Sequence, residues 1–288
     1  MKSNISLYVP VYNGESTIES VLKSIFKLNP GPDEIIIVDD GSSDNTLKIL
    51  NNYKDKIYII KNPENMGLAY SRNIGISKSK NDLVAALDSD VEVAEDWLKS
   101  LIQIKDKFGS AICGGKLIEK RKDENMYNFW RHIHATQNNY GTKDIENLNK
   151  PIAGSNTLLN KSAWKDVGGY EVQYKTNGED TTFCQKLLAK KYKISYSSFA
   201  KSYHLRNDNL RTLLNSVRRA YIYGAGLKKP TVMRFIQRTI RHFKNFILYS
   251  IEDIKIFKFY LVYINLMIFL NLTIKEFIGL LKNKPDYV

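Results

Sequence analysis

The sequence predicts an α/β protein with a doubly wound, mainly parallel sheet, followed by a C-terminal α-helical extension. Two observations carry this prediction. Over residues 5–107, short runs of β-branched and apolar residues alternate with segments whose apolar residues recur at helical spacing, which is the order of a parallel βαβ fold. From Asn209 onward the pattern is helical, with one break at Lys229-Pro230.

The elements of residues 5–107 follow one another regularly. The run EIIIV at Glu34–Val38 is continuously apolar, as expected of a strand buried on both faces. Strands are predicted at Ile5–Tyr12, Glu34–Val38, Ile57–Ile60 and Leu83–Leu87. Helices are predicted at Ser16–Leu28, Asp44–Tyr53, Leu68–Ser77 and Glu95–Lys107. In such a sheet, ligands bind at the carboxyl ends of the strands.

The next part of the chain is less regular. Residues 120–150 are polar and irregular, which predicts an insertion or a loop, and regular signals return at Ile152–Leu159. Helices are expected from Lys161 and from about Thr181. We therefore predict one domain over residues 1–207, divided near residue 118, and a separate helical tail over 208–288.

Composition excludes several classes of protein. With 43% hydrophobic and 25% charged residues, a packed core is expected and general disorder is not. The two cysteines, Cys113 and Cys184, are too few for a disulfide framework or a cysteine-based zinc site. The N-terminal stretch MKSNISLYVPVYNG has the pattern of a strand rather than a signal peptide. A cytoplasmic protein is therefore expected.

Positive charge is concentrated late in the chain. The formal net charge is +13, and residues 201–258 contain 13 Lys and Arg against three Asp and Glu. A basic surface of this kind indicates binding to phosphates, either of nucleic acid or of anionic lipid.

Acidic residues gather where the predicted strands end. Asp39 and Asp40 follow the second strand, and Asp88-Ser89-Asp90 follows the fourth. Crowded carboxylates are unfavourable unless a cation or a donor ligand compensates them, and a D-x-D can present oxygens to Mg²⁺ or Mn²⁺. No G-x-G-x-x-G opens the first helix and no P-loop motif is present, which argues against a dinucleotide-binding enzyme or a P-loop NTPase.

Six segments together resemble one family. VPVYNG, IIIVDDGSSDNT, NPENMGLAYSRNIGI and LVAALDSD resemble the nucleotide-sugar-binding half of family 2 glycosyltransferases, which have the Rossmann-like GT-A fold. AGSNTLLNKSAWKDVGGYE and NGEDTTFCQKLLAKKYKI resemble the acceptor-side half. The resemblance covers about residues 4–205. It implies a catalytic domain over 1–207, with the donor half at 1–118 and the acceptor half at 119–207.

The resemblance also implies roles for matching residues. Asp40 would hydrogen-bond the nucleotide base, Arg72 would lie near the diphosphate, and Asn156 could bond a sugar hydroxyl. The nucleotide-sugar site would comprise Pro10, Tyr12, Asp39, Asp40, Arg72, Asp88, Ser89 and Asn156.

The resemblance implies a metal ion and a general base as well. Mn²⁺ or Mg²⁺ would be held by Asp88 and Asp90, with Asp90 the more direct ligand, and His204 could complete the site. In the E-D pair Glu179-Asp180, the aspartate would be the general base and transfer would invert the anomeric carbon. The alternatives are first-turn helix carboxylates favoured by the macrodipole and a histidine that only ends a strand. His132 and His134 are expected in a loop or on the acceptor side.

The tail has the patterns of membrane-surface or interface helices. Over residues 232–250, Arg238, Arg241 and Asn245 share one helical face, and Ile236, Phe243 and Ile247 lie on the opposite one. That apolar face could pack on the catalytic domain or lie in a membrane interface. The uncharged run 259–274 would span only about 24 Å, less than the roughly 30 Å of a hydrocarbon core. An in-plane or packed helix, or a homodimer seam, is therefore expected.

These observations predict a peripheral enzyme on the inner face of the cell membrane. It would use a nucleoside-diphosphate sugar, expected to be UDP-linked, and extend a lipid-linked or cell-surface glycan, with residues 230–288 on the anionic membrane. One alternative is a polyprenyl-phosphate glycosyltransferase. Another is a nucleic-acid-binding module, for which no reader motif is present. An inactive scaffold is a further alternative.

Overall fold

The computed structural model describes residues 4–174, 176–224 and 229–283. Contacts divide the chain into two compact units. The sheet unit contains the residues up to 120 together with 136–205, and the helical unit contains 121–135 and the residues from 206 on. Parts of the predicted basic segment, 225–228, and of the predicted membrane tail, 284–288, lie outside the described residues.

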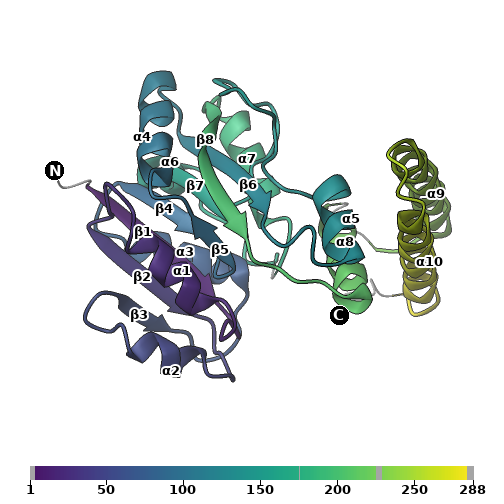
Figure 1. Ribbon diagram of the computed structural model, residues 1–288, viewed down its shortest axis with the longest axis horizontal. Helices are drawn as coiled ribbons and strands as arrows, with labels where there is room; N and C mark the ends of the chain where they lie inside the picture. Colours follow the sequence, from purple (N-terminus) through teal and green to yellow (C-terminus); the bar gives the residue numbers. More distant parts are fainter. Residues whose placement is uncertain (1–3, 175, 225–228, 284–288) are drawn as a thin grey trace. The chain divides into compact units, whose positions relative to one another are not determined.

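The sheet unit is built on one eight-stranded sheet (Figure 1). Its strands are β1 (Ile5–Val11), β2 (Glu34–Asp39), β3 (Tyr58–Lys61), β4 (Leu83–Leu87), β5 (Val91–Val93), β6 (Ile112–Glu119), β7 (Asn156–Asn160) and β8 (Ile194–His204). They lie in the order β3-β2-β1-β4-β7-β6-β8-β5. Strands β3, β2, β1 and β4 are mutually parallel, as predicted, whereas β7 runs antiparallel to β4 and to β6.

Helices cover both faces of this sheet. They are α1 (Ile18–Ile25), α2 (Thr46–Asn51), α3 (Leu68–Lys78), α4 (Trp97–Phe108), α6 (Lys161–Asp166) and α7 (Glu179–Ala189). Leu7 and Val9 of β1 pack in one core with α1, α2 and α4. Tyr8, between them, packs in a second core with α3, α6 and α7. Because successive strand residues point to opposite faces, these two cores confirm the doubly wound arrangement.

The close packing of α3 on β1 helps to position the site. Gly75 of α3 lies against Tyr8, and a Cβ at Gly75 would fall 2.5 Å from the Tyr8 ring. Only glycine permits this approach. It brings Arg72, one turn earlier in the same helix, to the end of β4, where it pairs with Asp88.

The helical unit contains one helix that the sequence did not predict. Its helices are α5 (Met126–His134), α8 (Leu210–Gly224), α9 (Val232–Lys255) and α10 (Tyr260–Leu281). Helix α5 lies in the stretch 120–150 that was predicted to be irregular, so this prediction was wrong for residues 126–134. The Asn125 side chain caps the helix by accepting hydrogen bonds from the N–H groups of Tyr127 and Asn128. Its buried side chains are Asn128, Trp130 and Arg131, a pattern that does not look apolar in sequence.

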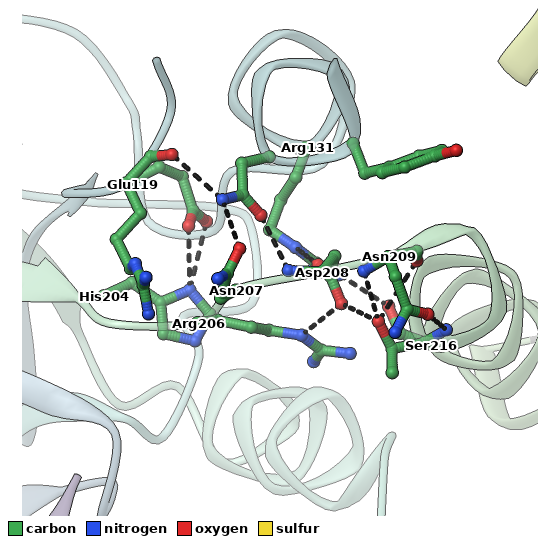
Figure 2. A network of polar contacts seen from close by, with 12 residues as sticks. Glu119, Arg131, His204, Arg206, Asn207, Asp208, Asn209 and Ser216 are labelled. Carbon is green, nitrogen blue, oxygen red and sulfur yellow. Dashed lines mark hydrogen bonds and ion pairs between the residues drawn. The ribbon is translucent and has the colours of Figure 1, made fainter. Parts of the chain in front are cut away.

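A buried polar network holds the helical unit together. Asp208 is buried and its carboxylate pairs with Arg131 at 2.5 Å and with Arg206 at 3.0 Å (Figure 2). Removing one partner of such a buried pair would leave an uncompensated charge. This network therefore fixes the start of α8 against α5.

A second buried network involves one of the histidines expected in a loop or on the acceptor side. His134 lies at the end of α5, and its Nε2 is 2.9 Å from Asp253 of α9. Asn265 of α10 donates to Asp253 at 2.7 Å and accepts from Trp130 at 2.6 Å. The expectation for His134 was therefore wrong, because its side chain belongs to the core of the helical unit.

Helix α9 packs through its polar face. Arg238 pairs with Glu276 of α10 at 2.8 Å, Asn245 donates to the Tyr221 hydroxyl of α8, and His242 is buried. The opposite, apolar face is exposed. Among the described residues, α10 is the one helix long and apolar enough to cross a membrane by length and composition.

Candidate functional site

The site is built where strands β1, β2 and β4 end. Since these strands are parallel, the residues that follow them lie along one edge of the sheet. Asp88, Ser89 and Asp90 form the turn between β4 and β5 and are all half-buried. The N–H of Leu205 donates to the Asp90 carbonyl at 2.8 Å, which holds the end of β8 against this turn. The predicted partners Asp90 and His204 therefore meet.

His204 lies between two carboxylates. Its Nε2 is 3.3 Å from Asp90 Oδ2. Its Nδ1 is 3.0 Å from Glu119 Oε2, as Figure 2 shows. Glu119 and His204 are register partners in β6 and β8, so the sheet itself sets their contact. Burial alone would lower the pKa of His204, but Asp90 and Glu119 outweigh burial and raise it to about 10.

These residues fit a divalent metal ion in part. Among the described residues, no three His, Cys, Asp or Glu side chains are grouped to hold a metal. Glu119 occupies one ring nitrogen of His204 and leaves the other directed at Asp90, which is the usual arrangement behind a metal-binding histidine. Asp88 is paired with Arg72 at 2.8 Å. The donor set therefore suits an ion with two protein ligands, Asp90 and His204, and further ligands from a bound molecule or water.

Arg72 holds three parts of the site together from within. Only 2% of this residue is exposed. Its Nη2 pairs with Asp88 at 2.8 Å, its Nη1 donates to the Gly154 carbonyl at 2.5 Å, and its Nε is 3.5 Å from Glu179 Oε1. A Cβ on Gly154 would lie 2.5 Å from Nη1, so a larger residue there would displace the Arg72 guanidinium. Arg72 was expected near a diphosphate, yet its donors point to protein groups, which favours a positioning role.

The two carboxyl groups of the E-D pair, Glu179 and Asp180, differ in burial. Glu179 is buried, and burial together with the neighbouring Asp180 raises its pKa to about 8, although Arg72 acts in the opposite direction. Asp180 is half-buried, and its Oδ1 accepts from the N–H of Thr181 at 2.7 Å. Burial and the charge of nearby acids including Asp180 raise the pKa of Asp88. Asp180 is therefore the more accessible carboxylate of the pair and lies in the same electrostatic field as the D-x-D turn.

The two aspartates at the end of β2, Asp39 and Asp40, are buried and already hydrogen-bonded. Asp40 Oδ1 accepts from Asn62 at 2.7 Å and from the N–H of Met66 at 3.0 Å, and its Oδ2 accepts from the N–H of Gly67 at 2.8 Å. Asp40 therefore fixes the 62–67 loop beside the strand end. Asp39 accepts from the N–H of Ser42 at 3.4 Å.

The expected contacts of the nucleotide base differ in accessibility. Tyr12 lies just beyond β1 and is 49% exposed. Pro10 is buried within β1, where it pairs in register with Val38 of β2. Tyr12 is therefore the one of these two that can lie against a ligand with its side chain.

The structure does not support the expected role of Asn156. This residue is fully buried, its Oδ1 accepts from Trp97 Nε1 at 2.6 Å, and its Nδ2 donates to Ser202 Oγ at 2.6 Å. Both ends of the amide are thus satisfied inside the protein. The expectation that Asn156 bonds a sugar hydroxyl is corrected: the side chain joins α4, β7 and β8.

Glu119 is the site residue that sequence reasoning missed. Its carboxylate is buried at the end of β6 and touches His204, which lies 85 positions later in the sequence. The only signal in the sequence is an acidic residue ending the run ICGGKLIE. That signal does not name a partner, since the β6/β8 register is set by the fold.

A family model and curated relatives assign this chain to the same protein family. Residues 6–168 match the family model described as Glycosyl transferase family 2. The chain is 27% identical over 216 residues to the O-antigen chain rhamnosyltransferase RfbN of Salmonella typhimurium, covering 70% of this chain and 67% of that protein. It is 28% identical over 211 residues to a poly-β-1,6-N-acetyl-D-glucosamine synthase of Staphylococcus aureus, covering 72% of this chain and 51% of the synthase. The chain thus spans about half the length of the synthase.

Solved structures share the fold. S. aureus TarS 1–349 in complex with UDP-GlcNAc aligns with a TM-score of 0.57 at 20% identity, covering 76% of this chain and 65% of that chain. The mannosyltransferase PcManGT of Pyrobaculum calidifontis, in complex with GDP-Man and Mn²⁺, aligns with a TM-score of 0.58 at 16% identity, covering 76% and 61%. At these identities the likeness establishes the architecture of the sheet and its helices, the GT-A fold.

Proposed function

Because the chain belongs to glycosyl transferase family 2, we propose that it moves a sugar from a nucleoside-diphosphate sugar, most simply a UDP-sugar, to a hydroxyl of a lipid-linked or cell-surface glycan. One observation carries the proposal: acidic side chains and a histidine lie close together at one end of the sheet, namely Asp88, Asp90, His204 and the Glu179-Asp180 pair. The names of two relatives, one for an O-antigen chain and one for poly-β-1,6-N-acetyl-D-glucosamine, support a glycan acceptor.

Asp180 is the general base in this proposal. As the acceptor oxygen attacks the anomeric carbon, Asp180 takes its proton, and the bond to the diphosphate breaks with its electron pair on the departing oxygen. Attack from the side opposite the diphosphate inverts the anomeric carbon. Base catalysis of this kind contributes about 10²–10⁴ in rate. The raised pKa of Glu179, about 8, supports giving the role to its more accessible neighbour.

Asp90 and His204 would hold Mn²⁺ or Mg²⁺, with oxygens of the donor and water as the remaining ligands. His204 would release its Nε2 proton when it binds the ion, and an imidazole ligand favours Mn²⁺. A divalent ion bound there would compensate the charge that develops on the leaving diphosphate. Asp88 acts through its ion pair with Arg72, which keeps the turn between β4 and β5 in position.

The donor base would bind beside the end of β2. Tyr12 is accessible there and offers an aromatic face for stacking. Asp39 and Asp40 border the same strand end, and Asp40 orders the 62–67 loop. We propose that the enzyme lies on the inner face of the cell membrane, where attachment raises the effective concentration of a membrane-held acceptor.

A polyprenyl-phosphate glycosyltransferase is the second candidate, and the length and apolar composition of α10 favour keeping it. Transfer of labelled sugar to a bare polyprenyl phosphate would select this candidate. Transfer only to a saccharide-bearing acceptor would select the first.

The testing experiment is a donor screen. Release of UDP, GDP and dTDP is measured from their sugar donors with Mn²⁺, with Mg²⁺ and with EDTA. UDP release that requires the metal is expected, and Asp90→Ala should abolish it. Asp180→Asn should abolish transfer while donor affinity stays within a few-fold, and Asp106→Asn, on the exposed side of α4, is the matched control. Near-normal turnover of Asp180→Asn would refute the assignment of the base.

A further inference from the structure

Helix α9 is amphipathic but packs with its polar side inward. Arg238 pairs with Glu276 at 2.8 Å, and His242 is buried against Tyr221, with ring centroids 4.9 Å apart. Burial, helped by nearby arginines, lowers the pKa of His242 to about 4, so it is neutral inside the unit. On the polar face, Arg238 and Asn245 thus find partners on neighbouring helices, whereas most of the apolar face stays exposed in the described part of the helical unit.

The exposed side of α9 is a continuous apolar stripe. Ile236, Ile240, Phe243, Ile247, Ile251 and Ile254 are all exposed. Their spacing of three and four residues places them on one side of the helix. Soluble monomeric proteins rarely expose a continuous apolar stripe of this length, so the stripe indicates a surface that binds a partner or a membrane.

Helix α10 continues this surface. Tyr263, Leu266, Leu270, Ile274, Phe277 and Leu281 are exposed at the same helical spacing. The stripes meet where Phe243 packs on Phe269 and Phe235 packs on Phe277, with ring centroids 5.7 and 5.8 Å apart. Of the 24 large apolar side chains exposed among the described residues, 19 lie between Val232 and Leu281. We call this surface the outer face.

Cations accompany the outer face. Residues 229–283 contain nine Lys and Arg against three Asp and Glu. Two of the three acids are engaged inside the unit, Asp253 with His134 and Asn265, and Glu276 with Arg238. Lys244 and Lys255 are exposed beside the apolar stripe of α9, and Arg241 is exposed although it belongs to the polar face. The charge available at this surface is therefore almost entirely positive.

The turn between α9 and α10 presents an aromatic residue where glycine is usual. The N–H of Lys258 donates to the Asp253 carbonyl at 2.9 Å, and the N–H of Phe257 donates to the Ile254 carbonyl at 3.0 Å, which is the Schellman pattern that ends helices. Phe257 has φ +58° and is 80% exposed. A left-handed conformation is unfavourable for a bulky residue. Phe257 therefore stabilises neither the turn, where its backbone is strained, nor the core, from which its side chain is absent.

We propose that the outer face lies flat on a bilayer containing anionic lipids. The apolar stripes of α9 and α10 enter the interfacial layer, the flanking cations meet lipid phosphates, and Phe257 inserts at the tip. Charge decides against a second copy as the occupant, because two such faces would bring like charges together. The pairs Arg238–Glu276 and Asn265–Asp253 decide against α10 crossing the bilayer, because crossing would carry them into hydrocarbon.

Flotation of the full chain with vesicles tests this proposal. Vesicles of phosphatidylcholine containing about 30% phosphatidylglycerol should bind the protein, and pure phosphatidylcholine vesicles should bind it much less. Phe257→Gly should bind about tenfold less with an unchanged or raised melting temperature, since glycine suits the left-handed turn. Arg241→Glu together with Lys244→Glu should reduce binding by about 25-fold or more. Phe199→Ala, at an exposed aromatic of β8, is the matched control and should bind like the wild type.

Three results would overturn the proposal. The first is a wild-type chain that does not float with the anionic vesicles. The second is binding by both Phe257→Gly and the charge-reversed variant that equals binding by the wild type. The third is a dimer in solution without lipid that Ile240→Arg dissociates, which would assign the outer face to a second copy. The membrane proposal rests on the proposed function only in the purpose that it gives to the contact, which is to reach a membrane-held acceptor. A protein that floats with vesicles but releases no UDP would refute the reaction and not the membrane contact.

Discussion

The buried carboxyl of Glu179 predicts that the sheet unit loses stability as pH rises through neutrality. In the unfolded chain this group deprotonates near its ordinary pKa of 4.5, whereas burial and Asp180 raise its pKa to about 8 in the folded protein. Between these values the folded state holds one more proton than the unfolded state. Stability must then fall as pH rises from about 4.5 to about 8, with no further loss from this group above that range.

The magnitude follows from the two pKa values. At ~1.36 kcal/mol per pH unit, a carboxyl whose pKa moves from 4.5 to about 8 accounts for on the order of 5 kcal/mol. Glu179→Gln cannot ionise and keeps the size of the side chain. The variant should therefore match the wild type at about pH 5 and exceed it by roughly 3–5 kcal/mol at about pH 9.

Urea unfolding of both proteins across this pH range checks the prediction. Fluorescence reports on the sheet unit through buried Trp97, with Trp130→Phe as the background so that the helical unit does not contribute through its buried tryptophan. Glu64→Gln, at an exposed carboxylate, is the matched control. If the stability difference between Glu179→Gln and the wild type stays constant from about pH 5 to about pH 9, the carboxyl ionises normally in the fold. The division of the E-D pair into a buried neutral acid and a free base would then be refuted.

Three further substitutions probe the supports of the site. Arg72→Met should cost about 3–5 kcal/mol in urea unfolding, because it leaves the Asp88 carboxylate without its buried cation and the Gly154 carbonyl without its donor. Glu119→Gln should weaken Mn²⁺ binding in the presence of UDP by about 10–100-fold in an EPR titration, since His204 loses the carboxylate that orients it; unchanged affinity would exclude this support. Asp40→Asn should cost about 2–4 kcal/mol in thermal unfolding and expose the loop 62–67 to protease, because an amide nitrogen then faces backbone N–H donors; an unaltered cleavage pattern would contradict this.

The first half of the fold could be predicted because its strands are apolar throughout. EIIIV and LVAAL are strands buried on both faces, so local pattern and tertiary environment agree. Helix α5 was missed because its buried face is made of Asn128, Trp130 and Arg131. These side chains are buried only because the distant residues Asp208 and Asn265 satisfy them. A polar segment becomes helical core only when such partners are supplied, and sequence pattern does not supply them.

The site could be predicted as a set of residues but not as a set of roles. Motif positions placed Asp90, His204 and Asp180 together, and the structure brings them to one end of the sheet. Spacing does not tell whether a polar side chain faces a ligand or the interior. Arg72 and Asn156 both turn inward, because each satisfies buried polar groups that would otherwise be costly.

The same limit explains the tail. A helical wheel separates two faces of α9 but carries no information on which one is buried, because either face lowers the free energy if it meets a matching partner. Here Glu276 and the Tyr221 hydroxyl match the polar face, and no described residue of the helical unit covers the whole apolar stripe. Burying the arginine side without Glu276 would cost several kcal/mol. The ion pair between Arg238 and Glu276 therefore turns the polar face of α9 inward and the apolar residues outward. Glu276 thus sets which side chains form the outer face, although it is not part of that face.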